Sequence, residues 1–151
     1  IFRWPGVIPP GRQSDALTAA IDILPTLSHA CGIDLKSISK GSPVIDGVDV
    51  WGTLIGKKGF AHPRNDLLYW HGAKGFYAIR VGDWKMFFNR KGAELKGGDG
   101  KAPVLFNLTD DVAEKNDLSA KHPERIKAMK ALASKRLAEI KANSIPLGKD
   151  G

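Results

Sequence analysis

The sequence predicts an α+β fold: a small antiparallel sheet of about four strands, packed by a long C-terminal helix. Residues 78–88 (AIRVGDWKMFF) form two apolar segments around Gly82-Asp83, and glycine in the first central position is typical of a type II′ hairpin turn. Residues 123–143 repeat apolar side chains at helical spacing behind Pro123, which suits the first position of a helix. Packing the two elements together would bury the apolar side of each.

The two-residue turn also predicts the register of the hairpin. Val81 is expected opposite Trp84, and Ile79 opposite Met86. One side of the hairpin then carries a continuous row of apolar side chains, namely Tyr77, Ile79, Val81, Trp84, Met86 and Phe88. The same register sets Arg80 opposite Lys85, and like charges in directly opposite positions destabilise a sheet.

Two explanations of this cation pair remain open. Asp111 or Glu114, which follow the last expected strand, can lie beside Arg80 and Lys85 and form a charge network with them. Alternatively, the two cations bind a substrate sulfate directly. The first explanation is favoured because an anion of the same chain is within reach.

The remaining elements of this half follow from the same patterns. Strands are expected at 67–70, 76–81, 84–89 and 104–108, followed by a helix from Pro123 to about Asn143. The helix has an apolar stripe of Ile126, Met129, Leu132 or Ala133, Leu137 and Ile140. Its solvent side is expected to carry Lys127, Lys130, Lys135 and Lys141.

The first half of the chain predicts less regular structure. Residues 1–12 resemble the end of a strand entering a Pro/Gly turn, so we expect the chain to be a piece of a longer protein. A helix is expected at 22–31, capped by Asp22 at its start and stopped by Gly32. Residues 33–65 form a long connection with one helical turn at Leu54-Ile55, closed by Gly56.

Composition leaves several classes of function open. The 151 residues carry a net charge of +7, but the basic residues are scattered, and such a field attracts anionic glycans as well as nucleic acid. The single cysteine, Cys31, excludes an intrachain disulfide and is expected to be an inert core thiol. The acidic segment 110–117 lacks the glycine and the final glutamate of an EF-hand calcium loop.

The loop 70–75 (WHGAKG) is the best candidate for binding. His71 and Lys74 are the candidate substrate-binding residues, because a cation, an imidazole and a tryptophan together suit an anionic sugar. An ordinary hairpin loop explains the same residues equally well. His29, His62 and His122 are interpreted as surface, loop and helix-boundary residues, since none of them stands at metal-ligand spacing.

Five segments, in order, resemble motifs of one enzyme family. They are FRWPGVIPPG (2–11), AIDILPTLSHACGI (20–33), VIDGVDVWGTLIG (44–56), LLYWHGAKGFYAIRVGDWKMFF (67–88) and LFNLTDDVAEKNDLS (105–119). Together they resemble the C-terminal part of a type I sulfatase, from the formylglycine-dependent arylsulfatase family. Val112 stands where the family usually has proline, which loosens one turn.

The resemblance implies an architecture and an activity. Residues 1–65 would end a large α/β domain of the alkaline-phosphatase type, and residues 66–151 would form a C-terminal α+β subdomain. The intact enzyme would hydrolyse sulfate esters with a formylglycine and Ca²⁺. The nucleophile motif C/S-x-P/A-x-R is absent from this sequence, so this segment is expected to hold no catalytic residue and no metal, and to be inactive alone.

The resemblance also implies partners and a location. The expected partners are the N-terminal catalytic part of the same enzyme and a sulfated small molecule or glycan, with no nucleic acid and no membrane. A periplasmic or secreted location is expected. Two alternatives remain: a non-catalytic basic module that binds anionic glycan or nucleic acid, and a relative that acts on phosphate esters.

Overall fold

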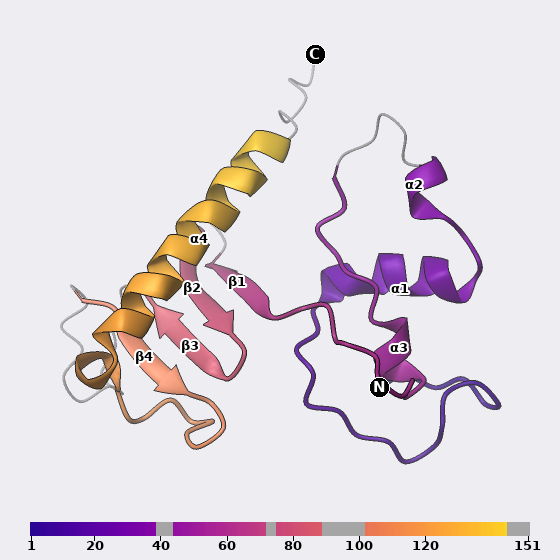
Figure 1. The fold of residues 1–151 in the computed structure, drawn as a ribbon, viewed down its shortest axis with the longest axis horizontal. Helices are drawn as coiled ribbons and strands as arrows, with labels where there is room; N and C mark the ends of the chain where they lie inside the picture. The colour runs from indigo at the N-terminus through magenta and orange to yellow at the C-terminus, as the bar shows by residue number, and fades with distance from the viewer. Residues whose placement is uncertain (39–43, 72–74, 89–101, 145–151) are drawn as a thin grey trace. The chain divides into compact units, whose positions relative to one another are not determined.

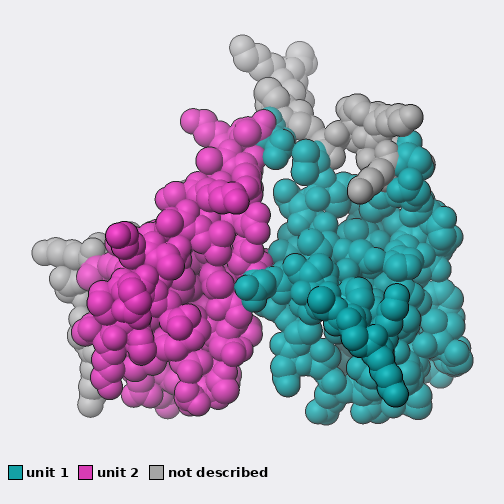
Figure 2. All heavy atoms as spheres, in the orientation of Figure 1, with its two compact units in different colours: residues 1–65, 143–151 teal, residues 66–142 magenta. Residues whose placement is uncertain are grey.

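The structure is a computed structural model that describes residues 1–38, 44–71, 75–88 and 102–144 (Figure 1). The chain divides into two compact units (Figure 2). Unit 1 comprises residues 1–65 and 143–151, and unit 2 comprises residues 66–142. No helix among the described residues is both long enough and apolar enough to cross a membrane.

Unit 2 is built on a four-stranded antiparallel sheet, as predicted. Its strands are β1 (Asp66–His71), β2 (Gly75–Val81), β3 (Trp84–Phe87) and β4 (Val104–Asn107), and they lie side by side in chain order. The turn between β2 and β3 has Gly82 at a φ of 56°, a conformation that glycine adopts without strain. The pairs Val81–Trp84, Arg80–Lys85 and Ile79–Met86 confirm the predicted register.

One face of the sheet is covered by helix α4 (Pro123–Asn143), as Figure 1 shows. Met129 and Ala133 of α4 are buried against side chains of β2, β3 and β4 that have no exposed surface, namely Ile79, Met86 and Leu105. The helix therefore begins and ends where the sequence predicts, and its apolar stripe faces the sheet. Only the end of the stripe differs, because Ile140 is exposed.

A β-bulge changes the face on which Tyr77 lies. Tyr69 pairs with Ala78, but Trp70 pairs with Phe76, so Tyr77 is an extra residue in β2. Phe76 therefore packs in the cluster on the α4 side, whereas Tyr77 packs with the opposite cluster of Ala78, Phe87, Val104 and Phe106. The prediction that Tyr77 shares a face with Ile79 is wrong because strict alternation breaks at the bulge.

Unit 1 contains short helices joined by irregular chain. They are the 3₁₀ turn η1 (Ala20–Asp22) and the helices α1 (Ile23–Ala30), α2 (Leu35–Ile38) and α3 (Trp51–Leu54). The predicted helix at 22–31 is confirmed as α1, and Gly32 ends it at a φ of 71°. The predicted helical turn also forms, although it starts at Trp51 rather than Leu54.

Two expectations about unit 1 are wrong. Residues 1–12 form no strand; instead, Val7 and Ile8 donate backbone hydrogen bonds to the carbonyl of Trp4 in a turn. Asp22 does not cap α1 with its side chain, because its carboxylate accepts hydrogen bonds from other segments.

Helix α1 buries polar side chains and exposes apolar ones. Thr26 and Ser28 are buried, whereas Ile23, Leu24 and Leu27 are about half exposed. Cys31, expected in a core, is exposed at the C-terminal end of the same helix. The expectation of a core thiol fails because the side of the helix that unit 1 covers is its polar side.

Candidate functional site

The predicted binding residue His71 lies at the exposed end of β1, opposite Gly75 of β2. Its imidazole stands edge-on to the ring of Tyr77, with 6.2 Å between ring centroids. Tyr77 in turn lies 6.3 Å from Tyr69. The bulge that moves Tyr77 to this face therefore supplies the ring that supports His71. Lys74, the other predicted binding residue, lies outside the described residues.

Trp70 lies beside His71 but on the opposite face of the sheet. Its side chain is 51% exposed, and its ring is held edge-on to Phe76 at 5.7 Å. The end of the β1–β2 hairpin thus presents an indole on one face and an imidazole on the other. An aromatic face can pack on the C–H groups of a sugar, and a protonated imidazole attracts an anion. We call Trp70, His71 and Tyr77 the hairpin-end group.

Arg80 and Lys85, the cation pair of the sheet, each have a hydrogen-bond partner within the chain. Lys85 Nζ lies 2.6 Å from Oε1 of Glu114, and both side chains are mostly buried. The same ammonium lies 4.8 Å from the ring centroids of Tyr69 and Phe87, at cation–π distance. Arg80 donates from Nε to the carbonyl of Gly82 at 2.7 Å. The predicted anion is therefore confirmed for Lys85, as Glu114, whereas the partner shown for Arg80 is a backbone carbonyl rather than a carboxylate.

Asp111, the other candidate anion, has a different role. Its carboxylate accepts hydrogen bonds from the backbone N–H groups of Asn116 and Lys115, at 2.7 and 2.8 Å. These bonds hold the pKa of Asp111 below its ordinary value. Asp111 therefore closes the turn that carries Glu114 toward Lys85.

A buried ion pair joins three segments of unit 1. Asp22 is 2% exposed and accepts two hydrogen bonds from the guanidinium of Arg64, at 2.8 and 2.5 Å. It also accepts the backbone N–H groups of Ala19 and Val48, both at 2.9 Å. Burial pushes the pKa of Asp22 up, but these hydrogen bonds outweigh it, so the pKa lies below its ordinary value.

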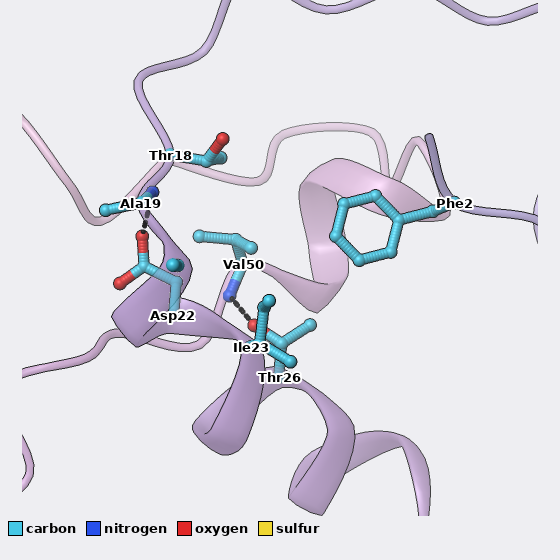
Figure 3. A pocket seen from close by; sticks show the side chains of 8 residues that line it. Phe2, Thr18, Ala19, Asp22, Ile23, Thr26 and Val50 are labelled. Atoms are coloured by element: carbon cyan, nitrogen blue, oxygen red, sulfur yellow. Dashed lines mark hydrogen bonds between the residues drawn. The ribbon is translucent and has the colours of Figure 1, made fainter.

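A cavity of about 240 Å³ lies beside this ion pair (Figure 3). Figure 3 shows Asp22 bonded to Ala19, and Thr26 bonded to the backbone of Val50, at its wall. Among the described residues, no buried side-chain nitrogen or oxygen lacks a hydrogen-bond partner. The buried polar side chains of its wall, Asp22 and Thr26, are thus committed to partners within unit 1, and we assign the cavity no chemistry.

The other histidines have structural contacts. His62 Nε2 donates to the carbonyl of Leu17 at 2.7 Å, and its Nδ1 is hydrogen-bonded to the hydroxyl of Thr53 at 2.8 Å. His29 pairs with Asp49, which also accepts the backbone N–H of Trp51. Sequence reasoning missed these partners, which are distant in the chain.

His122 occupies the predicted helix boundary. Its carbonyl accepts the N–H groups of Arg125 and Ile126, and its ring stands edge-on to Trp84 at 5.0 Å. In the described part of the chain, no group of three or more His, Cys, Asp or Glu side chains could hold a metal ion.

Comparison with known proteins identifies similar chains. The family model described as the C-terminal region of aryl-sulfatase matches residues 62–148. Arylsulfatase G of Rattus norvegicus is 35% identical over 80% of this chain and 24% of its own length. Arylsulfatase A of Bos taurus is 29% identical over 85% of this chain and 28% of its own. The chain thus spans about a quarter of the length of these curated relatives.

Solved structures show the same fold. The PsFucS1 sulfatase from Pseudoalteromonas sp. superposes with a TM-score of 0.73 over 94% of this chain and 30% of its own, at 22% identity. The structure of BT4656 in complex with D-glucosamine-2-N,6-O-disulfate gives a TM-score of 0.65 over 94% of this chain and 28% of its own, at 20% identity. At these identities the likeness concerns the fold alone.

Proposed function

The chain belongs to the family of aryl-sulfatase C-terminal regions, and on this premise we propose that it completes an enzyme that hydrolyses sulfate esters. The observation that carries the proposal is the match of the family model to residues 62–148, more than half of the chain. The ordered motifs in residues 1–56 extend the resemblance upstream of that match. Family membership favours this function over a free-standing basic module.

The chemical step belongs to another part of the enzyme. The sequence contains no C/S-x-P/A-x-R motif for a formylglycine, and the described residues offer no cluster of metal ligands. These residues therefore do not fit the formylglycine or the Ca²⁺ that the resemblance implies. The partner required by the proposal is the N-terminal catalytic part of the same polypeptide, in a periplasmic or secreted enzyme.

Within this division, residues 1–65 end the large α/β domain and residues 66–151 form the C-terminal subdomain. The hairpin-end group is the substrate-side feature of the subdomain. His71 is exposed and its ring is supported by Tyr77, so it can present a ring N–H to a sulfate or a sugar hydroxyl. Lys74, from the same predicted loop, would add a positive charge. The substrate is a sulfated small molecule or glycan.

The experiment measures hydrolysis by the full-length enzyme, with 4-nitrophenyl sulfate and 4-nitrophenyl phosphate as substrates. We expect turnover of the sulfate ester, and no turnover by residues 1–151 alone. A preference for the phosphate ester would contradict the proposal.

The substrate role of the hairpin end is tested in the same enzyme with His71→Ala and Lys74→Ala, each measured on a sulfated monosaccharide. KM should rise several-fold while kcat changes little, because the side chains bind substrate without taking part in bond cleavage. Lys127→Ala removes an exposed charge from the solvent side of α4 and serves as the matched control. Unchanged KM values in both variants would remove these residues from the site.

A further inference from the structure

Trp70 exposes a flat apolar ring whose position is fixed by the aromatic side chains beside it. Trp70 is 51% exposed and stands edge-on to Phe76, its partner on the neighbouring strand, with 5.7 Å between ring centroids. Phe76 in turn stands edge-on to Phe88 at 4.9 Å and packs on the buried cluster that α4 covers. A ring that is already held in place loses little conformational freedom when a ligand covers it. Trp70 therefore offers a rigid surface for binding.

The place of Trp70 at the edge of the sheet limits which ligands can use this ring. β1 is the first strand in the sheet order, so among the described strands it pairs on one side only, with β2. Trp70 and His71 are consecutive in β1 and point to opposite faces, since one contacts Phe76 and the other contacts Tyr77. Stacked sheets lie about 10 Å apart, which is the thickness of one sheet with its side chains. A single sugar at His71 therefore does not reach the indole, whereas a linked sugar beyond the edge does.

An anionic glycan has the chemistry that this edge can bind. An indole face packs against the C–H groups of a sugar ring. The open side of an edge strand carries backbone N–H and C=O groups that can hydrogen-bond to sugar hydroxyls. His71 supplies a ring N–H beside them, and the net charge of +7 attracts an anionic chain.

We propose that the substrate is a sulfated oligosaccharide that crosses the edge of β1, with its sulfated sugar at His71 and a linked sugar stacked on Trp70. The inference rests on the proposed function and names the length of substrate that the hairpin-end group recognises. Trp70 is then a specificity-determining residue. It selects a glycan chain over a single sulfated sugar without touching the bond that breaks.

The test compares substrates of two lengths in the full-length enzyme. The probes are sulfated tetrasaccharides from chondroitin sulfate, heparan sulfate and carrageenan, each paired with the sulfated monosaccharide that it contains. KM and kcat are measured on the pair that is hydrolysed fastest. Trp70→Ala should raise the KM for the tetrasaccharide, relative to that for the monosaccharide, about tenfold with little change in kcat, because only the longer substrate stacks on the indole. His71→Ala should raise both KM values and leave their ratio unchanged.

Further variants separate stacking from apolar contact and from loss of folding. Trp70→Phe keeps a flat ring and should retain most of the preference for the tetrasaccharide, whereas Trp70→Leu keeps apolar surface without a ring and should lose it. Val112→Ala removes an apolar side chain that is 82% exposed elsewhere in unit 2 and is the matched control. An unchanged KM ratio in Trp70→Ala would overturn the proposal. If Trp70 instead packs on another segment of the enzyme, Trp70→Ala would lower the melting temperature and leave that ratio unchanged.

Binding of the tetrasaccharides is measured by calorimetry on the same variants, so the two proposals fail separately. Hydrolysis of 4-nitrophenyl sulfate by an enzyme that binds no tetrasaccharide would refute the oligosaccharide site and keep the sulfatase function. Tetrasaccharide binding that is weakened in Trp70→Ala, without hydrolysis of any sulfate ester, would refute the sulfatase function and keep the sugar site. Binding that Trp70→Ala leaves unchanged would refute the role of the indole.

Discussion

Unit 1 and unit 2 bury different kinds of side chain. Among the described residues, every buried apolar side chain except Val50 lies in unit 2. The buried polar side chains Asp22, Thr26 and Ser28 all lie in unit 1. Unit 2 therefore has a hydrophobic core of its own on both faces of its sheet, whereas hydrogen bonds and the Asp22–Arg64 ion pair hold segments of unit 1 together.

The two main helices differ in which of their sides is buried by their own unit. Helix α4 buries Met129 and Ala133 against the sheet and turns its lysines outward. Helix α1 turns Leu24 and Leu27 outward and buries Thr26. Amphipathic patterns predict which side of a helix is apolar, but not whether that side is covered by the same unit. A helix that exposes its apolar side is the part of the chain that we expect to contact another surface.

The largest effect is expected from a substitution in the hydrophobic core of unit 2. Phe106 has no exposed surface and packs against Phe87 at 6.0 Å. Phe106→Ala should lower the free energy of unfolding by about 4 kcal/mol, because the cavity adds to the lost burial. Chemical denaturation measures the change, and hydrogen exchange locates it, with faster exchange expected in β3 and β4. A loss below about 1 kcal/mol would show that this core is not tightly packed.

The next largest loss of stability is expected from removing the ion pair of unit 1. Asp22→Asn leaves the buried guanidinium of Arg64 without its anion and should cost about 3 kcal/mol. Faster exchange is expected in residues 19–30, with β2 and β3 as internal reference. Asp15→Asn, at an exposed position, is the matched control and should change little. Equal effects of the two substitutions would contradict the role of the pair.

A smaller loss of stability is expected from removing the anion beside Lys85 in unit 2. Glu114→Gln removes the anion beside Lys85 while keeping the shape of the side chain. Because both side chains are mostly buried, the expected cost is about 2 kcal/mol in thermal or chemical unfolding. Glu124→Gln, in a largely exposed pair with His122, should cost less than about 0.5 kcal/mol. Equal costs would mean that Glu114 does not relieve the cation pair.

The smallest effect near neutral pH is the titration of Asp22. Its pKa in the folded chain lies below the ordinary value of 3.8, so the folded state favours the ionised form. This contribution to stability is present above the ordinary pKa and is lost as the pH falls through the lowered folded pKa. Stability should change little from pH 7 to 5 and fall below pH 4, less steeply in Asp22→Asn. An identical slope in wild type and variant would refute this role.

The sequence predicts well those features that depend on neighbouring residues. Gly82-Asp83 fixes the hairpin register, and Pro123 with the apolar stripe fixes the bounds of α4. The sequence also names Glu114 as one of two alternative anions for the cation pair, and Glu114 is the one that contacts Lys85.

The predictions that are wrong concern features that depend on residues far apart in the sequence. The bulge that moves Tyr77 arises from pairing with β1, and no residue within β2 signals it. Asp22 and Arg64 are 42 residues apart in the sequence, so the neighbouring residues of Asp22 suggest only a helix cap. Cys31 has apolar neighbours in sequence, but whether they are covered depends on the fold. For the candidate site, the sequence predicts that His71 lies at the end of a hairpin, where the structure exposes it, but not that a tyrosine supports its ring.

Hydrogen exchange tests directly whether the rest of the enzyme covers helix α1. The amides of residues 23–30 are compared between residues 1–151 alone and the full-length enzyme, with β2 and β3 as reference. If α1 needs a surface from the rest of the enzyme, its amides should exchange at least about tenfold more slowly in the full-length protein, while those of β2 and β3 change little. Equal protection of α1 in the two proteins would show that unit 1, like unit 2, is complete without that surface.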